Sequence, residues 1–127
     1  MAQGRGSANH IVALGVLLLL CILINGPLAE STVYNVGDAS GWTFNTVGWT
    51  NGKTFKAGDV LVFKYNPNIH NVVAVNAAAY KSCTVPAGAR VFKSGNDRIR
   101  LRKGTHRFIC GSAGHCNAGM KIAVRVV

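Results

Sequence analysis

Hydrophobic and polar residues alternate along six short stretches of the chain, and a two-residue period is typical of β-strands with one buried face. Leu61 and Phe63 fall on one face of such a stretch, and Ile122, Val124 and Val126 share one face of the last. The predicted strands cover residues 32–36, 60–65, 72–75, 98–102, 105–110 and 120–127.

Turn-forming residues separate these strands, and no long segment has apolar residues at helical spacing. Asn51-Gly52 is a tight-turn pair, loops are expected over 85–88 and 94–97, and a single helical turn is expected over 77–80. Short strands at regular spacing, divided by Gly, Asn and Asp, predict an all-β domain, either a β-sandwich or a barrel.

The core of this domain has to be built from few large side chains. About 96 residues follow residue 31, and a chain of that length buries only about 60–65% of its unfolded surface. Aromatic side chains contribute most to such a core, so Trp42, Phe44 and Trp49 are all expected to pack in it or close to it.

The first 31 residues have the pattern of a secretory signal peptide. Arg5 supplies the positive start, and residues 11–24 form an apolar run that is shorter than the roughly 20 residues of a membrane span. Cleavage is expected after Ala29 or after Ser31, which leaves residues 32–127 as the mature domain. The alternative is that the run stays attached as a membrane anchor.

The chain is strongly basic, with a net charge of +10 from 14 Lys and Arg against 4 Asp and Glu. Only Asp38, Asp59 and Asp97 are acidic after residue 31. Such a surface favours acidic partners. Since the leader indicates export, an acidic redox partner or acidic cell-wall polysaccharide is expected rather than nucleic acid. The alternative is that the positive charge binds no particular partner and only keeps a small protein soluble.

A loop near the end of the chain collects soft metal donors. Cys110, His115 and Met120 follow one another at five-residue intervals, with small residues between them. A blue-copper site needs two His, one Cys and a weak axial Met, so the second His has to come from elsewhere. His70, at the start of an apolar strand, is the candidate. His106 has no matching position and is expected at the surface or at a strand edge.

Each of these donors has a simpler reading when it is taken alone. His70 would then be a turn histidine, Cys110 a free buried thiol and Met120 a filler of the core. A structural zinc site made from Cys110, His70 and His115 is another alternative, although zinc rarely takes a thioether. The combined spacing favours one copper ion as the cofactor.

From residue 32 onward the chain resembles the phytocyanins, the plant branch of the cupredoxins, and among them the plantacyanin or basic blue protein subgroup. The matching motifs are Val36-Gly37-Asp38 with Gly41-Trp42, Asn-Pro-x-x-His70-Asn71-Val, and Cys110-x4-His115-Cys116-x3-Met120. The resemblance implies a cupredoxin-like Greek-key sandwich with short helical turns and a type 1 copper site of His70, Cys110, His115 and Met120.

The resemblance also implies roles for residues beside the ligands. Asn71 is expected to help hold the site, and His115 is expected near the surface as the exit for the electron. Cys83 and Cys116 are expected to form a disulfide, which accounts for the two cysteines of the mature domain that do not bind metal. Ser112-Ala113 replaces a Phe-Pro pair of the family pattern, so the docking patch around His115 differs from that pattern.

The predicted function is that of a secreted, monomeric blue copper protein that carries single electrons in the extracellular space or cell wall. Four protein donors leave no position open for a substrate, which disfavours an enzyme, including an oxidase. The alternative is an extracellular signalling or adhesion protein, reproductive or in the cell wall, in which copper is structural or senses redox state.

Overall fold

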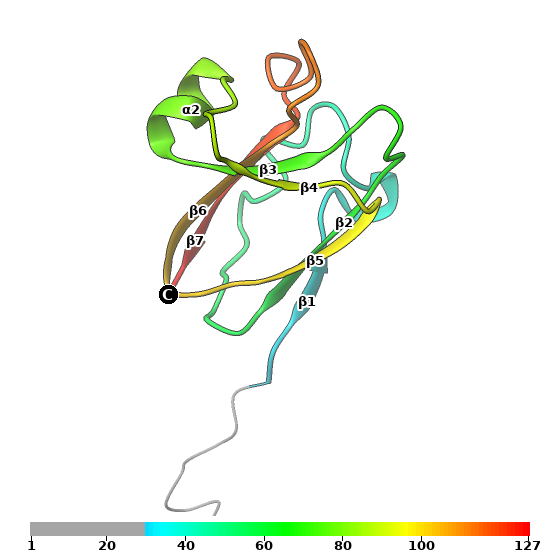
Figure 1. The fold of residues 1–127 in the computed structure, drawn as a ribbon. Coiled ribbons are helices and arrows are strands. Elements are labelled where there is room, and N and C mark those ends of the chain that lie inside the picture. Colours follow the sequence, from blue (N-terminus) through cyan, green and yellow to red (C-terminus); the bar gives the residue numbers. More distant parts are fainter. Residues whose placement is uncertain (1–29) are drawn as a thin grey trace, which may run out of the picture. The chain divides into compact units, whose positions relative to one another are not determined.

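The computed structural model describes residues 30–127, and Ser31–Val127 form one compact unit (Figure 1). The apolar run of the predicted signal peptide lies outside the described residues, as does Ala29. Within the described part, no helix has the length and hydrophobicity needed to cross a membrane.

Seven strands within residues 30–127 form two sheets. The first sheet has the order β1-β2-β5, made of Val33–Asn35, Val60–Lys64 and Asn96–Arg100. The second has the order β4-β3-β6-β7, made of Arg90–Phe92, Val72–Val75, Gly104–Ile109 and Lys121–Val126. β1 runs parallel to β2, and the other pairs are antiparallel. The prediction of an all-β sandwich is therefore confirmed.

The core forms where the inner faces of the two sheets meet, as the alternating pattern predicts. Phe63 of the first sheet and Phe108 of the second pack with ring centroids 5.3 Å apart, and Trp42 stands edge-on to Phe63 at 5.1 Å. The buried cluster consists of Val36, Trp42, Phe55, Leu61, Phe63, Val72, Leu101, Phe108, Cys110, Met120, Ile122, Val124 and Val126. Two metal-ligand candidates, Cys110 and Met120, thus belong to the core itself.

The helical turn predicted over 77–80 is confirmed and is longer than expected. Helix α2 covers Ala77–Ser82, and the side chain of Asn76 caps it by accepting a 2.9 Å hydrogen bond from the amide of Ala79. A second short helix, the 3-10 turn η1, covers Asp38–Ser40. It lies in the long connection between β1 and β2, which a parallel pair of strands requires.

The loop predicted over 94–97 is wrong at its end, because β5 already begins at Asn96. Asp97 pairs with Phe63 and points inward, where it is buried. Its carboxylate accepts hydrogen bonds from the hydroxyls of Ser94 and Tyr65. Because Asp97 stands where the alternating pattern requires an apolar residue, the pattern does not indicate that the strand has already begun. The short edge strand β4 was not predicted either.

Candidate metal centre

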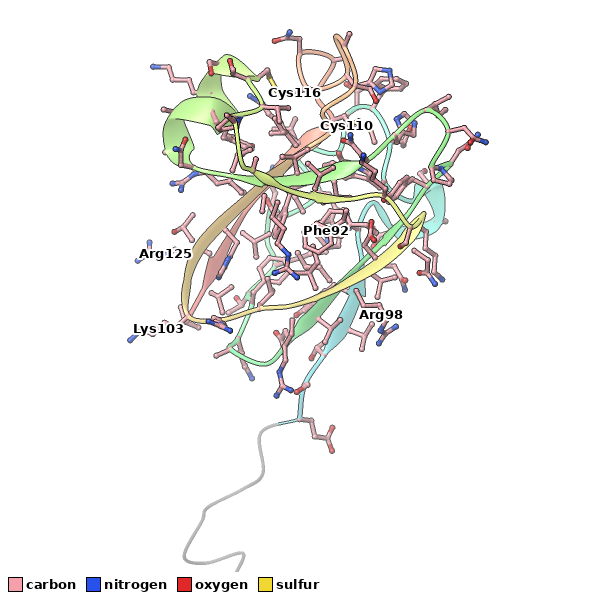
Figure 2. The ribbon with its side chains drawn as sticks, in the orientation of Figure 1. Phe92, Arg98, Lys103, Cys110, Cys116 and Arg125 are labelled. Carbon is pink, nitrogen blue, oxygen red and sulfur yellow. A yellow bond between two sulfur atoms is a disulfide. The ribbon has the colours of Figure 1, made fainter. Side chains whose placement is uncertain are left out.

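Strand pairing brings the separate parts of the predicted site to one end of the sandwich. His70 lies just before β3 and Cys110 just after β6, and these strands are antiparallel neighbours with Val73 opposite Ile109. Residues 40 positions apart in sequence therefore meet. In Figure 1 the loop after β6, drawn in orange, lies at the same end of the molecule as the green loop that leads into β3. The label of Cys110 lies at this end in Figure 2.

Three donor atoms converge on one point. The Nδ1 atoms of His70 and His115 are 3.0 Å apart, and the Sγ of Cys110 lies 3.9 Å from the first and 3.6 Å from the second. Such separations are those expected when one ion binds nitrogen at about 2.0–2.1 Å and sulfur at about 2.3 Å. Within residues 30–127, these three residues form the one cluster of His, Cys, Asp or Glu that could hold a metal.

Met120 ends the loop that carries Cys110 and His115. It is completely buried, and its backbone accepts a 3.0 Å hydrogen bond from the amide of Cys110 and donates one of 3.1 Å to the carbonyl of His115. β7 begins one residue later, so the sheet fixes this end of the loop. The backbone thereby ties Met120 directly to two ligand residues.

Burial favours the neutral state of the His70 imidazole, which is the state that binds a metal. His70 is only 7% exposed, and this burial lowers its pKa below the usual value, with a further decrease from the neighbouring His115. A metal requires a neutral imidazole, so a lowered pKa reduces competition by protons. His115 is half-buried and lies nearer to solvent than His70, as expected for it.

Asn71 links the two ligand-bearing segments by a hydrogen bond. Its Oδ1 accepts a 2.6 Å hydrogen bond from the amide of Gly111, and its backbone carbonyl accepts one of 2.8 Å from the indole of Trp42. A Cβ at position 111 would lie 3.1 Å from that Oδ1, so glycine permits this close approach. The hydroxyl of Ser112 adds a 2.8 Å bond to the carbonyl of Ile69.

The expected disulfide joins Cys83 to Cys116, with the Cα atoms 5.6 Å apart. It links the end of α2 to the residue after His115. Cys110 remains a free, buried thiol, which makes it available to a metal. The bridge therefore anchors the metal loop to the end of α2, and its two cysteines pack with Val73 of β3 and Ile109 of β6.

Phe44 is placed differently from the prediction. Trp42 is buried in the core and Trp49 is half-buried against it, but Phe44 is 43% exposed and belongs to neither group, so its predicted place in the core or close to it is wrong. Its ring stands edge-on to His115 at 4.8 Å and to His70 at 5.6 Å. In sequence a large aromatic residue is expected to be buried in the core. The loops that carry His70 and His115 meet only in the folded structure, where they give Phe44 two ring contacts outside the core.

His106 lies outside the metal cluster, in agreement with the prediction. It is half-buried in β6 opposite Val124, and the pairing of β6 with β3 begins only at Arg107. One of its ring nitrogens lies 2.7 Å from the carbonyl of Arg102. This histidine stabilises the start of β6 and takes no part in the site.

The donor set discriminates between metals. A buried thiolate, two imidazoles and a thioether are soft or borderline donors, which fit copper and exclude calcium and magnesium. Zinc fits the first three donors but rarely takes a thioether. A sandwich of two sheets that holds these four donors at one end defines a type 1, or blue, copper protein with a cupredoxin fold.

Comparisons with known proteins agree with this class. The plastocyanin-like domain family matches residues 40–120. Chemocyanin of Lilium longiflorum is 62% identical over 98% of this chain and 98% of its own length. The solved structure of cucumber basic protein, a blue copper protein, has a TM-score of 0.75 at 55% identity, over 76% of this chain and 100% of its own.

Spinach plantacyanin has a TM-score of 0.66 at 52% identity and covers the same shares of the two chains. The chain therefore belongs to the plastocyanin-like family of blue copper proteins, the phytocyanins. His70, Cys110, His115 and Met120 form its type 1 copper site.

Proposed function

We propose that this protein carries single electrons between partners outside the cell and is not an enzyme. The observation behind this proposal is that the core and the strand ends supply all four donors. Bound copper would supply the Cu(I)/Cu(II) couple. The chain fixes the donors by β3 and β6, the disulfide and the Asn71 hydrogen bond, so little rearrangement accompanies a change of charge on the ion.

The route for the electron follows from exposure. His115 is the less buried imidazole, and three exposed apolar residues, Phe44, Ile69 and Val85, lie around its loop. The ring of Phe44 contacts that of His115. The carbonyl of Ile69 accepts a hydrogen bond from the hydroxyl of Ser112, and the side chain of Val85 lies close to Gly111. This apolar surface around His115 lets a partner come close without a costly removal of water from charges, so the electron would leave through His115.

The charge of the domain supports an acidic partner. Of the three acidic residues after residue 31, Asp59 and Asp97 are buried and already engaged by hydrogen bonds, which leaves Asp38 at the surface. Many cations are exposed, and Figure 2 places Arg98, Lys103 and Arg125 away from Cys110. An acidic redox partner could be steered by this field while it docks on the apolar surface. Acidic cell-wall polysaccharide is the second candidate for the cations.

Export is part of the same proposal. The pattern of the leader supports secretion to the extracellular space or cell wall. The disulfide between Cys83 and Cys116 is consistent with an oxidising compartment.

The decisive experiment is spectroscopic and kinetic. The copper-loaded protein should show an intense blue thiolate-to-copper band with narrow copper hyperfine splitting and fast electron self-exchange. Cys110→Ser should abolish the band and the exchange, whereas Ser82→Ala, at an exposed serine of α2, should keep both. A colourless protein that purifies with zinc would contradict a copper site. A blue protein with slow self-exchange would contradict the role in electron transfer but not the copper site.

A further inference from the structure

Asp59 is a buried carboxylate whose two oxygens are both held by backbone amides. It is 2% exposed and lies one residue before β2. Oδ1 accepts a 2.9 Å hydrogen bond from the nitrogen of Thr32, and Oδ2 accepts one of 2.8 Å from the amide of Lys56. Burial of a carboxylate is costly unless a positive charge or strong hydrogen bonds compensate for it. Within residues 30–127 no side-chain cation pairs with it.

The nitrogen that faces Asp59 sits at the point where the folded domain begins. The carbonyl of Thr32 accepts a 2.9 Å bond from the amide of Val60, and β1 starts at the next residue. The compact unit starts at Ser31. Thr32 as a residue is exposed, whereas the carboxylate that its nitrogen faces is buried.

The sequence offers a cleavage site at the same bond. Ala29 and Ser31 occupy the two small positions that a signal peptidase recognises before the bond between Ser31 and Thr32. The cucumber structure provides independent support, because it matches 76% of this chain with 100% of its own length. Residues 32–127 make up the same share of this chain.

We propose that the mature protein begins at Thr32 and that its α-ammonium group forms an ion pair with the buried carboxylate of Asp59. Hydrolysis by signal peptidase breaks the bond between the carbonyl carbon of Ser31 and the nitrogen of Thr32. Water supplies the hydroxyl to Ser31 and a hydrogen to the new amine, which takes up a further proton at neutral pH because the usual pKa of an α-amine is about 7.7–8.0. The neutral amide contact seen in the uncleaved chain thus becomes a charge-assisted one, which is roughly twice as strong.

Removal of the leader would then stabilise the domain as well as shorten it. A chain cut after Ala29 would keep a neutral amide at position 32 and would leave Asp59 without a countercharge. The ion pair at Thr32 rests on the proposed export of the chain and is independent of copper and of electron transfer.

The first test is to express the full chain in a eukaryotic secretory host and to determine the intact mass and N-terminal sequence of the product. A start at Thr32 is expected, and a start at Glu30 would overturn the proposal.

The second test concerns the ion pair and uses copper-free domains that begin at Thr32 or at Glu30, each with and without Asp59→Asn. We expect Asp59→Asn to lower the folding equilibrium constant at least tenfold more in the Thr32 form, and equal effects in both forms would overturn the ion pair. Asp38→Asn, which alters an exposed carboxylate, is the matched control and should affect both forms equally.

A third measurement serves if Asp59→Asn does not fold. The α-amine of the unmodified Thr32 form should react with an amine-selective label at least tenfold more slowly in the folded than in the unfolded protein. Equal rates of labelling would overturn the ion pair.

Discussion

The side chain of Asn71 and the backbone of Gly111 lie 2.6 Å apart, and their hydrogen bond joins the residue after His70 to the residue after Cys110. The two ligands are thus linked by neighbours that do not bind metal. Since the indole of Trp42 also holds the carbonyl of Asn71, the core fixes the orientation of this link. The site is therefore organised by the protein before any ion binds.

Loss of the Asn71 side chain should loosen this link. Asn71→Ala leaves the amide of Gly111 without its partner, which should lower the free energy of unfolding by about 1–3 kcal/mol and shift the blue absorption band. Asn71→Asp keeps an acceptor oxygen and should recover most of the stability. Chemical unfolding and absorption spectra measure the two effects.

Asn96→Ala removes an exposed side chain of the same type from β5 and is the control. If Asn71→Ala behaved like Asn96→Ala in both measurements, the bond to Gly111 would have no role in holding the site.

Phe44 should protect the imidazoles from water and from competing ligands. Phe44→Ala removes the ring that contacts both His70 and His115, so copper should be lost several-fold faster to an excess of chelator. The free energy of unfolding should fall by only about 0.5–1.5 kcal/mol, because the ring is partly exposed. The decay of the blue band measures the loss. Val91→Ala, another exposed apolar residue, should leave the rate unchanged, and an unchanged rate in Phe44→Ala would refute the protective role.

The disulfide between Cys83 and Cys116 should stabilise the folded protein even when no copper is bound. Replacing Cys83 and Cys116 together by Ser opens a loop with a sequence separation of 33, for which chain entropy gives about 3–4 kcal/mol. Copper binding should also weaken, since Cys116 adjoins His115. Denaturant unfolding and copper titration measure these changes. Ser82→Ala, beside the bridge, should change stability by less than about 0.5 kcal/mol, and a similarly small change in the double variant would contradict this prediction.

Tyr65 should make stability depend on pH in the alkaline range. Burial and its hydrogen bond to Asp97 raise the pKa of Tyr65 from about 10 to about 12. The folded protein therefore keeps a proton that the unfolded chain loses between these values, so this contribution is complete below pH 10 and disappears as the pH rises towards 12. Tyr65→Phe should be less stable at neutral pH but should lose less stability over this interval.

The measurement is denaturant unfolding at several alkaline pH values, together with the ultraviolet absorbance of phenolate. Tyr34→Phe removes a hydroxyl that is bonded to the carbonyl of Thr54, and it should retain the wild-type slope. A slope for Tyr65→Phe equal to that of the wild type would contradict the assignment.

The architecture and the metal chemistry could be predicted from the amino-acid sequence. Alternation of apolar residues is a local property of each strand, so Leu61, Phe63 and Ile122 could be assigned to inner faces without knowledge of their partners. The identity of the donors is also local, because the spacing of Cys110, His115 and Met120 and the type of each side chain restrict the metal. The resemblance to a known family supplied the disulfide and the role of Asn71.

The contacts between residues far apart in sequence could not be predicted and depend on the packing of the sheets and loops. Phe44 lies beside two histidines because loops far apart in sequence meet there, and Asp97 can face the core because Tyr65 and Ser94 satisfy its carboxylate. The contact of Asp59 with the nitrogen of Thr32 likewise spans 27 residues. Hydrogen bonds and ring contacts of this range depend on how the sheets pack, and no periodicity along the chain encodes them.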